Sequence, residues 1–255
     1  EGGAFQMGSN DYDSEKPIHT VVVPAFWIGK YPVTFEEYDR YCAATSREKP
    51  ADEGWGRGRR PVINVSWDDA QAYARYRTQQ ARAGHDLEFG LPSQADWESA
   101  GHGADGREYV FGRRFRPKCM KSCFARRLPA IAPVLAFPID ESPYGAFDLT
   151  GNLWEWCEDT WQAGRALRGG GWNFVFPPFF RAATSPEPNA RAKPSMRSTA
   201  HIRFTAVGRA FRTSAALASS SASVRALLAA KTTAYAAAMP MAGAPRTTMS
   251  RIDSA

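Results

Sequence analysis

The sequence is poor in cysteine and histidine and contains no long apolar run. It has 255 residues with 4 cysteines and 4 histidines, and no apolar stretch approaches the ~20 residues that a membrane-spanning helix needs. The cysteines stand at positions 42, 119, 123 and 157, so no Cys/His arrangement completes a metal site. The start, Glu1-Gly2-Gly3, is not typical of a signal peptide. We therefore expect no membrane contact, and the cysteine content favours the cytoplasm.

Acidic residues are almost missing from the last quarter of the chain. Residues 188–255 hold 10 Lys+Arg and one acid, Asp253, whereas residues 1–187 hold 22 Lys+Arg and 25 Asp+Glu. Basic tails can bind nucleic acid. This tail has no tryptophan, because all 8 lie at or before Trp172, and it has few other aromatic side chains that could stack on bases. We therefore expect no nucleic-acid partner.

Three helices are predicted by capping boxes, in which Ser or Thr precedes an acidic residue by three positions. These boxes begin at Thr34, Ser66 and Ser93. Residues at helical spacing then predict the buried faces: Tyr38, Tyr41 and Cys42; Ala70, Tyr73 and Ala74; Trp97 and Ala100. Thr20–Val23 and Phe26–Ile28 are typical of strands, whereas residues 101–180 are dominated by Gly, Pro and aromatic residues. The predicted class is α+β, with a few helices on an irregular antiparallel sheet and many loops.

Several motifs in a fixed order carry a family resemblance. They lie at Phe5–Ser9, Glu15–His19, Ile28–Thr34, Pro61–Trp67, Leu91–Glu98, Tyr144–Gly145, Gly151–Trp156 and Arg168–Trp172. Together they resemble the formylglycine-generating-enzyme family, also called the sulfatase-modifying-factor family. The resemblance implies an elaborated C-type-lectin-like fold over residues 1–212. Residues 213–255 remain as a basic, Ala/Ser-rich tail that we expect to be disordered, although its alanines also permit local helix.

The resemblance also implies a catalytic centre whose ligands are missing. Family enzymes bind copper(I) with a cysteine pair just after an Arg-Gly-Gly-Ser-Trp motif and oxidise a substrate cysteine to formylglycine. Copper(I) needs such soft thiolate ligands, but residues 172–180 contain no cysteine. Iron-dependent relatives use histidines, which are scattered in this chain. We therefore expect a non-catalytic domain. The alternative is an oxidative protein-maturation enzyme, a metal-dependent oxidoreductase of the formylglycine-generating type.

A structural calcium ion is implied at the Gly-Asn-Leu-Trp-Glu motif. By resemblance, its ligands are Asp148, Gly151, Leu153 and Glu155, which would supply two carboxylates and two backbone carbonyls. Calcium prefers such hard oxygen ligands. The alternative is that Asp148 caps the turn and that Glu155 pairs with an arginine.

A ligand-binding segment is predicted directly after the last motif. It comprises Trp172, Asn173, Phe174, Phe176, Phe179, Phe180 and Arg181. In lectin-like folds this segment lines the binding surface, as the resemblance implies, and apolar patches often mark contacts. The alternatives are a buried, proline-kinked loop that closes the core, or a binding surface diversified by a retroelement that hypermutates such domains.

The end of the chain departs from the family pattern. Relatives close the sheet with a Gly-Phe-Arg strand, and the nearest in-frame match here is Gly208–Arg212. Out-of-frame codons for Gly-Phe-Arg would yield Ser-Ala-Ser-Val, which occurs at residues 221–224. One hypothesis is therefore a reading-frame slip between residues 175 and 220, which would leave a sheet edge open.

The sequence as a whole predicts a non-catalytic, calcium-stabilised recognition module of a larger bacterial protein. Its expected partner is a protein or peptide ligand, and fusion to a signalling kinase is implied by the resemblance. The alternatives are a variable ligand-binding protein of a diversity-generating retroelement and the oxidative enzyme.

Overall fold

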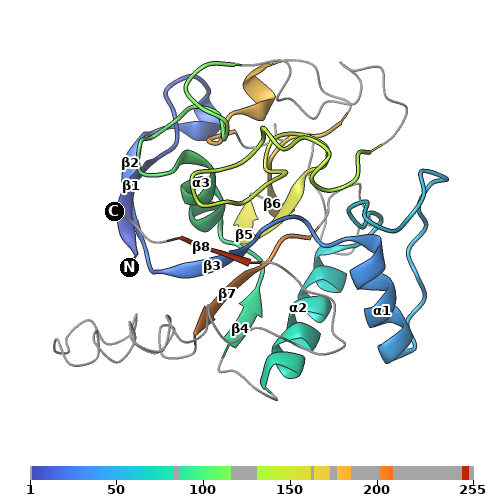
Figure 1. The fold of residues 1–255 in the computed structure, drawn as a ribbon. Coiled ribbons are helices and arrows are strands. Elements are labelled where there is room, and N and C mark those ends of the chain that lie inside the picture. The colour runs from blue at the N-terminus through green and yellow to red at the C-terminus, as the bar shows by residue number, and fades with distance from the viewer. Residues whose placement is uncertain are drawn as a thin grey trace, which may run out of the picture.

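The structure, a computed structural model, describes residues 2–82, 87–115, 131–161, 164–172, 177–184, 202–208 and 249–252. These residues form an α+β fold in which three α-helices lie against small antiparallel sheets (Figure 1). The predicted class is therefore confirmed. Loops rather than regular elements make up most of residues 103–115 and 131–154.

The three predicted helices form, and each begins at its predicted cap. They are α1 (Phe35–Thr45), α2 (Trp67–Arg82) and α3 (Gln94–His102). The capping-box contacts are present at Thr34–Glu37, Ser66–Asp69 and Ser93–Asp96. All eight side chains predicted to face the core from these helices are buried. Local capping and periodicity therefore account for this half of the fold.

The N-terminal strands form a hairpin beside α3. β1 (Gly3–Met7) runs antiparallel to β2 (His19–Val23), with Phe5 opposite Val21, and a 3-10 turn, η1 (Asp13–Glu15), lies in the connection. Phe5 and Val21 pack on the cluster around Trp97, so the hairpin closes one side of the core.

The main sheet has the order β4-β7-β3-β8. Its strands are β4 (Leu87–Gly90), β7 (Thr205–Gly208), β3 (Phe26–Gly29) and β8 (Met249–Ile252). Two expectations are wrong. The closing strand is present at Thr205–Gly208 and lies inside the sheet, so the predicted open edge does not occur. The tail is not disordered throughout, because Met249–Ile252 pair with β3. Residues 213–248 lie outside the described residues.

A second, two-stranded sheet carries the last motifs. β5 (Glu155–Trp161) pairs with β6 (Gly164–Arg168), and a 3-10 helix, η3 (Pro177–Phe180), follows. Three tryptophans, Trp97, Trp154 and Trp156, are buried, while Trp27 and Trp67 are half-buried.

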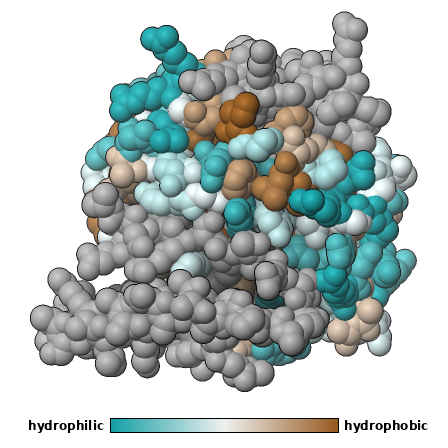
Figure 2. Space-filling view, in the orientation of Figure 1, coloured by the Kyte–Doolittle hydropathy of each residue, from teal (hydrophilic) through white to brown (hydrophobic). Residues whose placement is uncertain are grey.

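The helices and the visible surface can be described in terms of their apolar character. Among the described residues, none of the helices combines the length and apolarity that crossing a bilayer requires. On the face seen in Figure 2, apolar residues form small patches within a mainly hydrophilic surface.

Candidate functional site

The predicted calcium ligand Glu155 lies in a buried cluster of hydrogen-bond donors. Its carboxylate receives two bonds from Arg203, Nε to Oε2 at 2.7 Å and Nη2 to Oε1 at 2.8 Å. Trp97 Nε1 donates to Oε2 at 2.7 Å. Both charged side chains are 0% exposed. The guanidinium thus supplies the positive charge that this buried carboxylate needs, and Glu155 does not fit the role of a calcium ligand.

Arg203 also ties three distant segments together. Its Nη1 donates to the Gly29 carbonyl and its Nη2 to the Phe147 carbonyl, each at 2.7 Å. Ile202 and Phe204 on either side of it are buried. The segment 202–204 is therefore buried in the core directly before β7.

The other predicted calcium ligands hold their own loop. Asp148 Oδ2 accepts a hydrogen bond from the Leu135 N–H at 2.9 Å, and the Gly151 carbonyl accepts one from the Leu153 N–H at 2.9 Å. Among the described residues, no group of three or more His, Cys, Asp or Glu side chains could hold a metal ion. Calcium binding by Asp148, Gly151 and Leu153 stays a prediction, and the geometry at Glu155 counts against it.

A second buried ionic cluster lies under the Arg-Gly-Gly-Gly-Trp motif. Glu98 Oε2 pairs with Arg168 Nη1 at 3.0 Å, and Glu98 Oε1 accepts from the Gly8 N–H at 2.6 Å and contacts His102 Nε2 at 3.2 Å. Burial alone would raise the pKa of Glu98, but Arg168 and these hydrogen bonds hold the pKa below its usual value. Arg168 therefore serves the framework of the fold.

The described cysteines do not form a reactive pair. Cys42 and Cys157 are both buried and belong to different core clusters. Burial raises the pKa of the Cys157 thiol well above its ordinary value, and it also raises the pKa of Cys42. Both thiols are therefore held in the neutral form, which is neither nucleophilic nor metal-binding. Cys119 and Cys123 lie outside the described residues.

The predicted ligand-binding segment divides between core and surface. Phe180 is 2% exposed, and Arg181 is 4% exposed. Arg181 Nη2 donates to both oxygens of buried Glu15 at 2.9 and 2.8 Å. These two residues are structural, which corrects the prediction. Phe179 and Trp172 are half-buried, while Asn173, Phe174 and Phe176 lie outside the described residues.

Trp172 meets a second tryptophan from a distant loop. The rings of Trp55 and Trp172 lie edge to face, with centroids 5.5 Å apart and planes at 77°. Both rings are half-buried and pack on the main core cluster. Trp55 stands between Gly54 and Gly56, both in the left-handed backbone region. In the sequence, the signal for this contact is an isolated Trp between two glycines, Gly54-Trp55-Gly56.

The loops around this pair are held in uncommon backbone conformations. Among the residues that the structure describes, six that are not glycine have positive φ: Ser46, Glu53, Asn64, Leu135, Asp148 and Asn152. Ser46 only caps α1. The other five occur in loops that are hydrogen-bonded to one another. Because each such residue costs about 1–3 kcal/mol, they persist where surrounding contacts hold them, and they concentrate at functional sites.

Specific hydrogen bonds fasten these five residues. Asn64 Nδ2 donates to Glu53 Oε1 at 2.6 Å, and Leu135 bonds Asp148 as described above. The Asn152 side chain bonds both backbone groups of Ala132, at 2.9 and 3.1 Å, while the Asn152 carbonyl accepts from the Trp172 N–H at 2.7 Å. Asp148 and Asn152 are buried, so we call Trp55 and Trp172, together with Glu53, Asn64 and Leu135, the loop surface.

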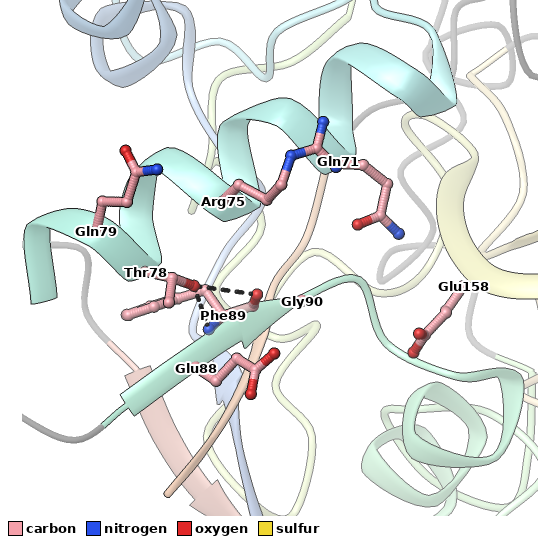
Figure 3. A pocket seen from close by; sticks show the side chains of 8 residues that line it. All are labelled: Gln71, Arg75, Thr78, Gln79, Glu88, Phe89, Gly90 and Glu158. Atoms are coloured by element: carbon pink, nitrogen blue, oxygen red, sulfur yellow. Dashed lines mark hydrogen bonds between the residues drawn. The ribbon is translucent and has the colours of Figure 1, made fainter. Parts of the chain in front are cut away.

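A polar groove of about 410 Å³ lies elsewhere, between α2 and β4 (Figure 3). It is lined by Gln71, Arg75, Thr78, Gln79, Glu88, Phe89, Gly90 and Glu158. Thr78 Oγ1 accepts from the Phe89 N–H at 2.9 Å and so covers this edge of β4. The groove shares no residue with the predicted sites, and its mixed charges select no ligand class.

The chain also matches a known domain family. Residues 1–212 match the family of sulfatase-modifying factor enzyme 1-like domains, and the chain belongs to this family. It is 28% identical to the bovine inactive C-alpha-formylglycine-generating enzyme 2, over 67% of this chain and 74% of the relative. It is 27% identical to the formylglycine-generating enzyme of Thermomonospora curvata, over 64% and 70%. Identity alone therefore does not separate active from inactive relatives.

Longer relatives and solved structures extend the comparison. The serine/threonine-protein kinase Pkn1 of Chlamydia trachomatis is 29% identical over 62% of this chain, which spans only 27% of that kinase. PvdO from Pseudomonas aeruginosa matches with a TM-score of 0.69 and 22% identity, covering 80% of this chain and 91% of PvdO. Treponema denticola variable protein 1 matches with a TM-score of 0.61, also at 22% identity, covering 80% and 94%. At these identities the structures show a shared fold and nothing more.

Proposed function

We propose that this chain is a non-catalytic recognition domain with a C-type-lectin-like fold, and that it binds a protein or peptide through the loop surface. The observation that carries the proposal is the pairing of Trp55 with Trp172 on loops held by five left-handed residues. Such rigid loops lose little entropy on binding. Tryptophans that expose part of a ring are frequent anchors in interfaces.

The cysteine chemistry supports a non-catalytic role. Residues 172–180 contain no thiol, and Cys157 is fully buried with a raised pKa. A thiolate pair for copper(I) is therefore not provided at the position where the family enzymes hold it. The oxidative enzyme remains the opposing function, and oxygen uptake with copper or iron and a cysteine-containing peptide tests it. Turnover that is lost in Cys157→Ala would overturn our proposal.

A place within a larger signalling protein is part of the same proposal. Its support is the kinase relative, of which the chain spans about a quarter. A diversified binding protein would use the same surface. DNA sequencing of the gene and its neighbourhood separates these cases: a nearby near-copy of the segment that differs only at adenines would favour diversification.

Peptide selection tests recognition directly. The full chain is immobilised, a random dodecapeptide phage library is selected on it, and the dissociation constant of the most enriched peptide is measured. We expect Trp55→Ala and Trp172→Ala each to weaken binding at least tenfold, since hot-spot aromatic residues contribute about 2 kcal/mol or more. Trp161→Ala, a half-buried tryptophan outside the loop surface, is the matched control. Failure to enrich any peptide, or equal binding by all variants, would contradict the proposal.

A further inference from the structure

Two adjacent arginines, Arg59 and Arg60, end the loop of residues 46–60 that carries Trp55, and their backbone is held on both sides. The Arg59 carbonyl accepts a hydrogen bond from the Val134 N–H at 2.9 Å. The Arg60 carbonyl accepts one from the N–H of Phe35, the first residue of α1, at 2.8 Å. These bonds fix the backbone from which both side chains extend.

The guanidinium of Arg60 lies next to the backbone that carries Trp55. Its Nε donates to the Ile131 carbonyl at 3.3 Å. A side-chain carbon placed on Gly56, which follows Trp55 in the sequence, would lie 3.3 Å from Arg60 Nη1. Arg60 as a whole is half-buried. Among the described residues, none accepts a hydrogen bond from its two Nη groups, so both are available to a ligand.

The contact of Arg60 with Ile131 connects it to the second tryptophan as well. Ile131 precedes Ala132, whose backbone N–H and carbonyl both bond the Asn152 side chain. The Asn152 carbonyl in turn accepts from the Trp172 N–H at 2.7 Å. Arg60 and the two tryptophans therefore belong to one hydrogen-bonded set of loops, and a ligand seated on the rings lies close to a fixed positive charge.

The other basic side chains of residues 46–60 already have carboxylate partners. The pairs are Arg47 with Asp69 at 3.9 Å, Lys49 with Asp39 at 3.7 Å, and Arg57 Nε with Asp39 Oδ2 at 2.9 Å. Within the part of the chain that the structure describes, neither Arg59 nor Arg60 forms an ion pair. The loop therefore carries two positive charges that its own paired carboxylates do not neutralise.

Two acids beside Trp55 are engaged within the loop surface and its own turn. Asp52 Oδ1 accepts from the Gly54 N–H at 3.2 Å, and Glu53 Oε1 accepts from Asn64 Nδ2 at 2.6 Å. A guanidinium that is half-buried without a counter-ion gains most from a charged acceptor, because such hydrogen bonds are roughly twice as strong as neutral ones. The chemistry beside the tryptophans therefore selects an anionic group.

We propose that the peptide bound by the loop surface presents a carboxylate to Arg60, while an apolar residue next to that carboxylate packs on Trp55 and Trp172. This inference rests on the recognition function proposed above and names its ligand class. The Nη1 and Nη2 groups match the two oxygens of a carboxylate. Arginine and tryptophan are also the residue types that most often dominate binding energy. The carboxylate is that of an Asp or Glu side chain or of the peptide C terminus.

Neutralised peptides test the proposal. The dodecapeptide selection on the full chain is run in two formats, with the peptide C terminus fused to the phage and with it free. The most enriched peptide from each format is synthesised as selected, with its Asp and Glu replaced by Asn and Gln, and with its C terminus amidated. We expect one of these neutralisations to weaken binding to the wild type about tenfold or more. The one that does so identifies the source of the carboxylate.

Arg60→Gln shows whether that carboxylate meets Arg60. This variant should bind the selected peptide about tenfold more weakly than the wild type, and it should bind the selected and neutralised peptides equally. Arg75→Gln removes the same charge from the exposed face of the polar groove, so it is the matched control and should bind like the wild type. Near-UV circular dichroism verifies the fold of each variant. If Arg60→Gln does not fold, Arg60→Lys replaces it, because lysine keeps the charge without the two-pronged donor, and it should bind about threefold more weakly.

The outcomes separate this proposal from the recognition function on which it rests. Peptides that bind through Trp55 and Trp172 but tolerate neutralisation would overturn the role of the carboxylate and leave recognition standing. The same holds if Arg60→Gln keeps the full preference of the wild type for the acidic peptide. A selection that enriches no peptide in either format would overturn both.

Discussion

The strands β7 and β8 share one neighbour, β3, but are held to the protein in different ways. β7 follows a segment whose three side chains, Ile202, Arg203 and Phe204, are all buried, and Arg203 neutralises the buried carboxylate of Glu155. β8 pairs with β3 on one edge and forms the border of the sheet, whereas β7 pairs with both β4 and β3. The comparison teaches that an interior strand is fixed by two neighbours and by the buried segment before it, while a border strand has a single neighbour.

Removal of Arg203 should give the largest effect. Arg203→Met leaves the buried carboxylate of Glu155 without the guanidinium that neutralises it, and breaking a buried ion pair in this way costs about 3–5 kcal/mol. We expect a loss of this size in the free energy of unfolding, measured by urea denaturation followed by tryptophan fluorescence.

The double variant Glu155→Gln/Arg203→Met is the control for that experiment. It removes the charge together with its partner, so it should recover part of the lost stability. A loss below about 1 kcal/mol in Arg203→Met would contradict our account of how β7 is anchored.

Acid should next weaken the other buried ion pair, that of Glu98 with Arg168. The pKa of Glu98 is lowered in the folded protein from a model-peptide value of 4.5. A lowered folded pKa means that its stabilisation is fully present above pH 4.5 and is lost as the pH falls through the folded pKa. Urea midpoints measured from pH 6 downward should therefore fall.

Glu98→Gln isolates this contribution from that of other acids. The variant should be about 1–3 kcal/mol less stable at pH 6, because it loses a charged hydrogen-bond acceptor in the core. Its midpoint should also vary less with pH below 4.5 than that of the wild type. If the urea midpoints of the wild type and Glu98→Gln fell equally with pH, the ion pair of Glu98 with Arg168 would not anchor the β1–β2 hairpin, which Glu98 contacts through the Gly8 N–H.

Breaking the β8 pairing should have a small effect on stability. Ser250→Pro is expected to lower the free energy of unfolding by about 1 kcal/mol or less, since it removes a backbone donor from an edge strand, where a hydrogen bond is worth about 0.5–1.5 kcal/mol net. Met249→Pro should match the wild type. A loss as large as that of Arg203→Met would erase the difference between the two strands and would argue that β8 is a permanent part of the sheet.

Removal of calcium should have the smallest effect. Because Arg203 already neutralises Glu155, excess EGTA should leave the thermal unfolding midpoint unchanged. A midpoint that rises with added calcium, through ligand linkage, would show that Asp148 and its neighbouring carbonyls bind the ion after all.

The helices could be predicted from the sequence because their signals are local. A cap, an acid three positions later and a periodic apolar face are all contained in about ten residues, as at Thr34 and Ser93. The α+β class and the loops that carry the motifs could be predicted from the same short-range patterns.

The anchoring of β7 could not be predicted in this way. Arg203 and Glu155 lie 48 positions apart. In a sequence, a glutamate whose carboxylate binds calcium cannot be told from one whose carboxylate binds an arginine. The segment at 202–204 is Ile-Arg-Phe and lacks the Gly-Phe-Arg pattern of the relatives, so that pattern does not identify it as the buried segment before β7. Similarly, the left-handed conformations of Glu53 and Leu135 are imposed by contacts with distant loops, and residue type does not reveal them.

The order in which the sheet is assembled has a consequence for synthesis on the ribosome. β3 is complete at residue 29, but the Arg203 side chain that bonds it lies 174 positions later. At roughly 5–20 residues per second, the nascent strand waits about ten to thirty-five seconds for its first partner. During that interval Phe26–Ile28 are an apolar segment whose partner strands have not yet been synthesised. Chaperones that bind exposed apolar segments would have this time in which to bind it.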